Sequence, residues 1–259
     1  MQRFGRTEDR VIKNNCPPLD SGSKTFAVRN FFDQTDRYLV NNGNIEIRRR
    51  VVRDLVGEIQ SAKILDLGCG DGSIALQFLS LSNSLTLVDI SSNMLEIARN
   101  QTPPALKMNV EYVNNELGQY QSSSKYDLVL CLGILAHVDV VENAIRKIAD
   151  LVKPEGRCVL QMTDDDRILG KLSGLYCDFR NRLKRRYPTT LNRTGVRGIR
   201  SLAAQFNMAC LAERRYASLL PAMGRMPLSW RSRYQLLTLN TPWLSRHGSE
   251  AILLFSKTA

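Results

Sequence analysis

The sequence has no long apolar run, although 43% of its 259 residues are hydrophobic. No stretch approaches the roughly 18 uninterrupted apolar residues that a membrane-spanning helix needs. The first fifteen residues are polar and charged, and they lack the apolar segment and cleavage site of a secretory signal. These two absences predict a soluble protein with a cytoplasmic location.

Histidine is scarce, and the cysteines form no recognisable motif. The chain has two histidines and six cysteines, and no two cysteines make the C-x-x-C pair that is typical of zinc and redox sites. Cys131 and Cys158 lie within strand-like apolar runs, as buried structural thiols do. We therefore expect reduced cysteines and no metal site.

Acidic residues are in the minority, with 25 Asp and Glu against 36 Lys and Arg, a formal net charge of +11 and a pI near 9.6. Basic residues concentrate from Arg167 to Arg200 and from Arg214 to Arg233. One interpretation is a solvated surface; the other is contact with an anionic partner such as nucleic acid, a phosphorylated metabolite or a peripheral membrane surface. Charge alone does not choose between them.

The length suits one α/β domain with insertions. Residues 1–24 carry Pro17-Pro18 and no apolar period, which predicts a mobile lead-in. From Phe26 to Ile59 apolar residues recur at helical spacing, which predicts two helices with a break near Asn41-Asn42-Gly43.

Short apolar runs then alternate with amphipathic stretches. This alternation predicts a parallel sheet covered on both faces. The predicted strands are Lys63–Gly68, Leu85–Ile90, Val110–Asn114, Tyr126–Leu132 and Gly156–Met162, and the predicted helices are Ser73–Leu81, Asn93–Asn100 and Val140–Val152. Beyond Met162 we expect a basic insertion over 164–195, a helix at Arg197–Phe206, a strand at Ala209–Tyr216, an irregular stretch over 217–250 and a last strand at Ala251–Phe255.

The strongest local signal is the run ILDLGCGDGS, where a buried strand leads directly into Gly68 and Gly70. Glycines there permit a sharp turn and close approach to a ligand. Asp89 ends the next strand, where a carboxylate can accept both hydroxyls of a ribose. Dinucleotides and S-adenosylmethionine both suit this arrangement. A carboxylate at Asp66 would repel a pyrophosphate and suits a cationic ligand, unless Asp66 only caps the turn.

The segment resembles motif I and its acidic follower in the class I S-adenosylmethionine-dependent methyltransferases. The similarity extends from about Ala62 to Met162 and includes the runs DISSNMLEIAR and LVKPEGRCVL. It implies a Rossmann-like, doubly wound, mostly parallel seven-stranded sheet with an antiparallel last strand, and S-adenosylmethionine as the cofactor.

The resemblance also implies roles for individual residues. Gly68 and Gly70 would line the methionine part of the cofactor, Asp66 and Cys69 would also belong to the cofactor site, and Leu132 would lie near the cofactor's amino end. Asp89 would hold the ribose. Glu116 stands where the family usually has an Asp that contacts adenine, so its longer arm weakens that expectation. The remaining residues expected around the adenine are Ile90, Met94, Asn115 and Leu117.

His137 follows the fourth strand, where many small-molecule methyltransferases of this superfamily carry a histidine. A neutral imidazole there could take a proton from the attacking group. The alternative is a histidine that only hydrogen-bonds loop backbone, because methyl transfer from a sulfonium can proceed through positioning without a base.

The acceptor side is expected from three parts: N-terminal lid helices over 25–60, and insertions over 164–195 and 217–250 around a cofactor core at 61–163. The expected substrate contacts are Phe32, Tyr38 and Tyr176. The leading hypothesis is methyl transfer to oxygen, nitrogen or carbon of a small molecule, including anionic or lipid-linked ones. The alternatives are an RNA-directed methyltransferase, a nicotinamide-dependent oxidoreductase and a binding protein without catalysis. The strand-four run LGILAH lacks the Asn/Asp-Pro-Pro-aromatic tetrad typical of base-amine methylation, which disfavours nucleic acid.

Overall fold

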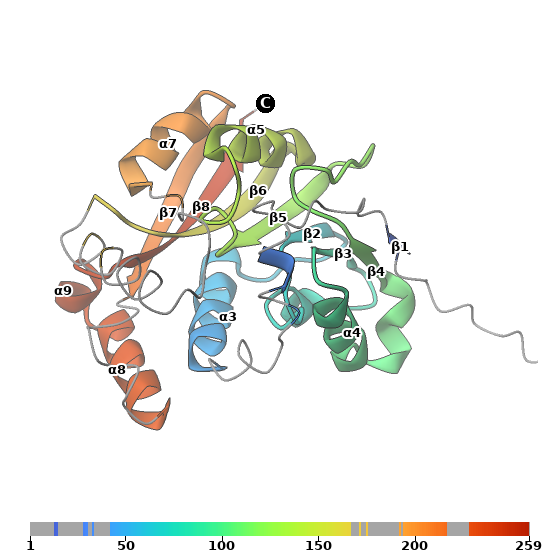
Figure 1. Cartoon of the computed structure of the whole chain (residues 1–259), viewed down its shortest axis with the longest axis horizontal. Helices are drawn as coiled ribbons and strands as arrows, with labels where there is room; N and C mark the ends of the chain where they lie inside the picture. Colours follow the sequence, from blue (N-terminus) through green and yellow to red (C-terminus); the bar gives the residue numbers. More distant parts are fainter. Residues whose placement is uncertain are drawn as a thin grey trace, which may run out of the picture.

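A central sheet organises the chain (Figure 1). The computed structural model describes residues 13–14, 28–30, 33, 42–166, 171, 175, 192, 194–216 and 228–258. The sheet order is β1-β4-β3-β2-β5-β6-β8-β7, and β8 alone runs antiparallel to its neighbours. The strands are β1 (Lys13–Asn14), β2 (Lys63–Leu67), β3 (Ser84–Asp89), β4 (Val110–Asn114), β5 (Tyr126–Leu132), β6 (Val152–Thr163), β7 (Met208–Tyr216) and β8 (Glu250–Lys257). The predicted fold class is confirmed, and the two-residue β1 adds an eighth strand beside β4.

Helices cover both faces of the sheet, as expected for strands that are apolar on both sides. On one face lie α3 (Asn42–Val56), α4 (Ser92–Gln101) and α8 (Leu228–Asn240); on the other lie α5 (Val141–Leu151) and α7 (Val196–Ala204) (Figure 1). Two buried clusters fill these layers, one around Val51, Val52 and Leu95 and the other around Ile148 and Ile199. Because the helices cover the two faces of the sheet, a site can form at the edge where the parallel strands end.

The predicted helix at Ser73–Leu81 is wrong: only a 3₁₀ turn, η1 (Ala75–Phe78), forms there. The side chain of Asp71 accepts hydrogen bonds from Ser73 N at 3.2 Å and from Ser73 Oγ at 2.6 Å. Such local side-chain bonds compete with helix formation. A second 3₁₀ segment, η2 (Pro104–Asn109), precedes β4.

The predicted irregular stretch over 217–250 is also wrong in part, because α8 and α9 (Pro242–Ser245) lie within it. The helix α8 has polar and apolar residues on both sides, so it lacks the period that reveals a helix in sequence. In the N-terminal region, α3 begins at Asn42, within the predicted break. The expected helix before it falls almost entirely outside the described residues.

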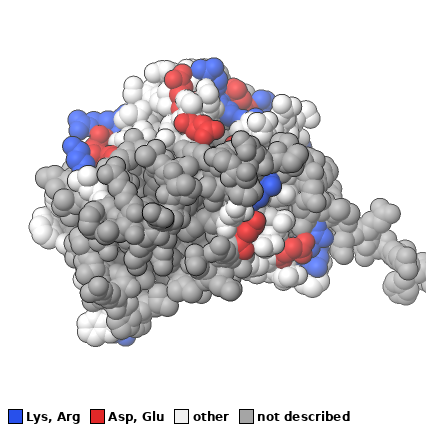
Figure 2. All heavy atoms as spheres, viewed as in Figure 1, with Lys and Arg blue, Asp and Glu red and all other residues white. Residues whose placement is uncertain are grey.

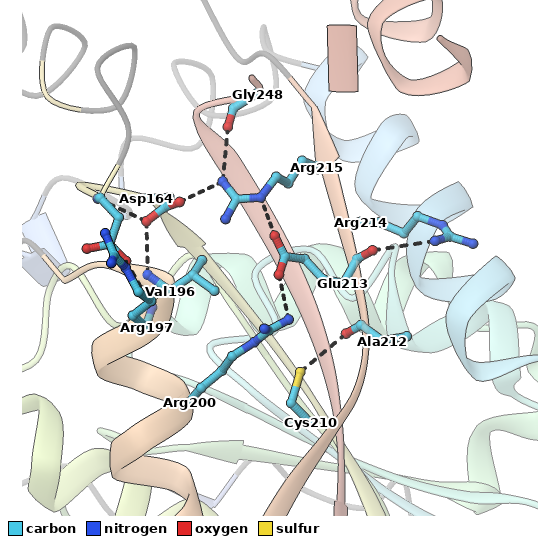
Figure 3. Close-up of polar contacts among 11 residues, drawn as sticks. Asp164, Val196, Arg197, Arg200, Cys210, Ala212, Glu213, Arg214, Arg215 and Gly248 are labelled. Carbon is cyan, nitrogen blue, oxygen red and sulfur yellow. Dashed lines mark hydrogen bonds and ion pairs between the residues drawn. The ribbon is translucent and has the colours of Figure 1, made fainter. Parts of the chain in front are cut away.

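A buried ion network joins the two ends of the predicted 164–195 insertion (Figure 3). The backbones of Asp164 and Thr194 form an isolated parallel β-bridge, and the Asp164 side chain accepts a hydrogen bond from Val196 N at 2.9 Å. Arg215 donates to Asp164 at 2.6 Å and also pairs with Glu213, which accepts from Arg200 at 2.6 Å. Burial opposes ionisation of Asp164, but the bonds from Val196 N and Arg215 hold its pKa below the ordinary value.

Among the residues that the structure describes, no helix combines the length and the apolar character needed to cross a membrane.

Candidate active site

The turn after β2 is packed so tightly that a side chain at Gly68 would collide with Ile134. Gly68 has a φ of +72°, and a Cβ on it would lie 2.7 Å from Cδ1 of Ile134. The amides of Gly68 and Cys69 donate to the Val88 carbonyl at 2.8 and 3.0 Å. The glycine is therefore required by backbone geometry and by the loop after β5.

Asp89 connects the end of β3 to this turn. Its Oδ2 accepts a hydrogen bond from Gly70 N at 2.8 Å, and its Oδ1 accepts one from Ser91 N at 2.9 Å. The Ser91 hydroxyl donates to Asp33 Oδ1 at 2.5 Å. The carboxylate is thus fixed in orientation at the mouth of the turn, and each oxygen retains lone pairs for further donors.

A cavity of about 560 Å³ opens in front of these groups. It lies at the carboxyl ends of β2 to β5, around the point where the strand order reverses, which is the usual ligand position in open α/β sheets. Nine predicted site residues line it: Gly68, Gly70, Asp89, Ile90, Asn115, Glu116, Leu117, Leu132 and His137. Its size suits a ligand the size of a nucleoside with an amino-acid arm.

Three predicted cofactor residues do not line this cavity: Asp66, Cys69 and Met94. Asp66 and Cys69 are buried at the turn, and Met94 is buried in α4. Their direct contact with a cofactor stays a prediction. The predicted substrate residues Phe32, Tyr38 and Tyr176 lie outside the described residues.

Three buried carboxyl groups surround the turn. Burial, reinforced by the charges of Asp89 and Asp71, raises the pKa of Asp66 to about 8. Burial also raises the pKa of Asp89, to about 6, although the amides of Ser91 and Gly70 oppose the shift and Asp33 adds to it. Both groups would ionise more readily beside a cation, so the site favours a positively charged ligand.

This electrostatic arrangement predicts a pH dependence. Folding raises the pKa values of Asp66 and Asp89, so the folded protein holds more protons than the unfolded chain between about pH 4 and 8. The free energy of unfolding should therefore fall as pH rises through that window. Affinity for S-adenosylmethionine should rise from pH 6 to 8, by up to about tenfold per pH unit for each proton released. Affinity for S-adenosylhomocysteine, which lacks the sulfonium charge, should rise less.

Isothermal titration calorimetry across this range would measure both affinities. The variant Asp66→Asn should flatten the S-adenosylmethionine profile near pH 8, while Asp150→Asn, on the exposed side of α5, should leave it unchanged. Parallel profiles for the two ligands in the unaltered protein would contradict the assignment.

The loop after β4 forms another wall of the cavity. Asn115 N donates to the Asp89 carbonyl at 3.0 Å, and the Asn114 side chain donates to the carbonyls of Asp89 and Ile90. From α5, Lys147 Nζ donates to the Gly118 carbonyl at 3.0 Å. These contacts hold Glu116 in the wall of the cavity, and its contact with adenine stays a prediction.

Arg48 is a site residue that sequence reasoning missed. It extends from α3 into the cavity wall, and its two terminal nitrogens lie 3.6 Å from the position a Cβ would have on Gly133. In sequence it belongs to the run Arg48-Arg49-Arg50, which looks like an exposed basic helix face. Only the packing of α3 selects which of the three arginines faces the cavity.

The loop that carries His137 is held by the returning end of the insertion. His137 N donates to the Ile134 carbonyl at 2.8 Å. Asn192 donates from its main chain to the Ala136 carbonyl at 2.9 Å and from its side chain to the Leu135 carbonyl at 3.4 Å. The half-buried His137 side chain lines the cavity beside Gly133 and Val138.

The residues present fit S-adenosylmethionine. The turn at Gly68 has no room for a side chain, Asp89 offers a fixed carboxylate, and Arg48 offers a cation in the cavity wall near Gly133. Such a set matches a ligand with ribose hydroxyls, a sulfonium and a carboxylate.

The comparisons with known proteins agree with this geometry. Residues 65–158 match the family model described as a methyltransferase domain. The mitochondrial ubiquinone biosynthesis O-methyltransferase of Schizosaccharomyces pombe is 30% identical over 125 residues, 48% of this chain and 45% of that protein. The ubiquinone biosynthesis O-methyltransferase of Escherichia coli O7:K1 is 29% identical over 151 residues, 57% of this chain and 62% of that protein. The chain thus spans about half the length of the curated relatives it matches.

Solved structures show the same fold. Magnesium protoporphyrin IX methyltransferase from Synechocystis, with bound S-adenosylhomocysteine, matches 91% of this chain and 100% of its own with a TM-score of 0.65 and 18% identity. A possible histamine N-methyltransferase from Thermotoga maritima matches 91% and 100% of the two chains with a TM-score of 0.61 and 15% identity. The fold, the turn with its acidic partner and the matched segment confirm the predicted resemblance: residues 65–158 match a methyltransferase domain and are similar to those of the class I, S-adenosylmethionine-dependent superfamily.

Proposed function

We propose that this protein transfers a methyl group from S-adenosylmethionine to a small-molecule acceptor, and that the acceptor atom is a phenolic oxygen. The observation that carries the proposal is one cavity lined by both the cofactor set, Gly68 and Asp89, and the acid-base candidate His137. S-adenosylmethionine, when bound, supplies a methyl group made electrophilic by the positive sulfur.

The chain's own residues would hold that cofactor. Asp89 would accept hydrogen bonds from ribose hydroxyls, and Glu116 would accept one from the adenine amino group. Arg48 would pair with the carboxylate of the methionine part, because a guanidinium binds a carboxylate strongly through parallel hydrogen bonds. Leu117 and Ile90, which line the cavity, would offer apolar contacts to the base.

His137 would accept the proton of the acceptor hydroxyl as the oxygen attacks. Asn192 holds the backbone of its loop, so the imidazole would enter the cavity from a fixed backbone position. Positioning supplies the rest of the acceleration, since in-line displacement depends on the geometry of the reacting atoms. Phe32, Tyr38 and Tyr176 remain our proposal for contacts to the acceptor, as part of the lid and insertion segments.

An oxygen acceptor is supported by the names of the curated relatives, which are O-methyltransferases of ubiquinone biosynthesis; the phenolic class is our proposal. That relation also favours an acceptor with a lipid tail over nucleic acid. The charge of +11 is the single feature that would suit RNA, and it suits an anionic surface equally. The cytoplasmic location stays a prediction.

Methyl transfer to a panel of catechols and phenols, with S-adenosylmethionine labelled in its methyl group, tests the proposal. We expect turnover with at least one phenol and none with RNA. His137→Ala should lower turnover by about 100-fold, the scale of general base catalysis, while cofactor affinity changes less than threefold. His247→Ala is the matched control, since His247 is the other histidine of the chain and lies exposed after α9. Unchanged turnover in His137→Ala would remove this residue from the mechanism.

A further inference from the structure

The helix α8 presents large apolar side chains to solvent. Trp230 is 64% exposed and Leu237 57% exposed, whereas Gln235 and Thr238 are each 1% exposed on the inward side. A helix on a soluble protein normally places its apolar residues inward. In α8, Leu236 and Leu239 pack partly against the core, but Trp230 and Leu237 are exposed to solvent.

These exposed groups form one stripe. Trp230, Arg233 and Leu237 follow one another at helical spacing, and all three are exposed. The short helix α9 packs against α8 and adds Trp243, which is 68% exposed. We call these residues, together with exposed Arg246, the α8–α9 surface. The two helices lie at one end of the molecule, beside β7 (Figure 1).

The charge of this region has one sign. From Leu228 to Ser249, the span of α8, α9 and the turn after them, the sequence contains three arginines and no Asp or Glu. In Figure 2 the described atoms at the lower left, where Figure 1 places α8, are white or blue, while the red carboxylate groups lie elsewhere on this face. An anionic partner is therefore electrostatically complementary to this surface.

We infer that the α8–α9 surface docks on the interface of an anionic lipid bilayer. Tryptophan prefers the boundary between headgroups and hydrocarbon, leucine prefers the hydrocarbon, and arginine reaches the anionic headgroups. Nucleic acid would satisfy the arginines but would leave Leu237 in water. Because α8 packs against α3, which supplies Arg48 to the cavity, the docked bilayer adjoins the side of the fold that holds the methionine end of the cofactor site.

The two tryptophans of the chain both lie on this surface, so their fluorescence reports on it alone. Adding vesicles of phosphatidylglycerol and phosphatidylcholine should shift the emission to shorter wavelength, and the protein should sediment with them. Vesicles of phosphatidylcholine alone should bind at least tenfold more weakly, and high salt should weaken the anionic binding.

Trp230→Ser combined with Trp243→Ser should lower sedimentation with anionic vesicles at least tenfold. Leu237→Ser keeps the fluorescence reporter and should lower it several-fold. The matched control is Leu81→Ser combined with Met108→Ser, which removes two exposed apolar residues (86% and 56%) from the opposite end of the molecule. Binding of S-adenosylmethionine in solution should be unchanged in every variant, which shows that each is folded.

Several results would overturn the inference. The unaltered protein could fail to bind anionic vesicles, or could bind them without an emission shift. The control variant could lose as much binding as the tryptophan variant. RNA or self-association, in place of vesicles, could cause the emission shift. None of these would affect the proposed methyl transfer, because that reaction is tested in solution without lipid.

Discussion

Replacing Asp89 with Ala should weaken S-adenosylmethionine binding by at least about 100-fold, because hydrogen bonds to a charged group contribute about 1.5–3 kcal/mol each. The carboxylate is held between Gly70 N and Ser91 N, so its position is set before the ligand arrives. Alanine would remove both the proposed acceptor of the ribose hydroxyls and the hydrogen bond from Gly70 N that fixes the glycine turn. Calorimetric titration at pH 8, where Asp89 is ionised, measures the loss.

Two companion variants make the Asp89 result interpretable. Asp89→Asn keeps an acceptor oxygen but loses the charge, so an intermediate loss of about tenfold is expected. Asp54→Ala removes an exposed carboxylate from α3 and should leave affinity unchanged. A folded Asp89→Ala protein that binds S-adenosylmethionine as tightly as the unaltered protein would refute the proposed ribose site.

Replacing Arg215 with Met should lower the free energy of unfolding by about 3–5 kcal/mol, the usual cost of breaking a buried ion pair from one side. Arg215 contacts both Asp164 and Glu213, and the Asp164 side chain is fully buried. Without the guanidinium, Asp164 would keep a buried charge with fewer partners, or its pKa would rise. Urea unfolding followed by circular dichroism measures the change.

The adjacent Arg214 provides the control for this experiment, because its side chain is exposed. Arg214→Met should change the free energy of unfolding by no more than about 0.5 kcal/mol. Adding Asp164→Asn to Arg215→Met should recover part of the loss, since the unpaired charge is then removed. Equal effects of Arg214→Met and Arg215→Met would show that the network of Figure 3 contributes little.

Much of the sheet could be predicted from local patterns. Val110–Asn114 and Tyr126–Leu132 form strands with the predicted bounds, because a run of apolar residues between polar turns has few alternatives to a buried strand. The glycine turn and Asp89 were also predictable, because the turn directly follows one predicted strand and Asp89 lies at the end of the next. The segment after Gly70 was not, because hydrogen bonds between Asp71 and Ser73 replaced the expected helix by a turn.

The sequence by itself determined the resemblance to the superfamily, the positions of the core strands along the chain and the acidic partner of the turn, all of which depend on short-range spacing. Tertiary structure alone decided that Arg48 faces the cavity, that Asn192 fixes the His137 loop and that α8 exposes Trp230. Each of these depends on which face of an element packs against a partner distant in the chain, and spacing along one segment does not encode that partner.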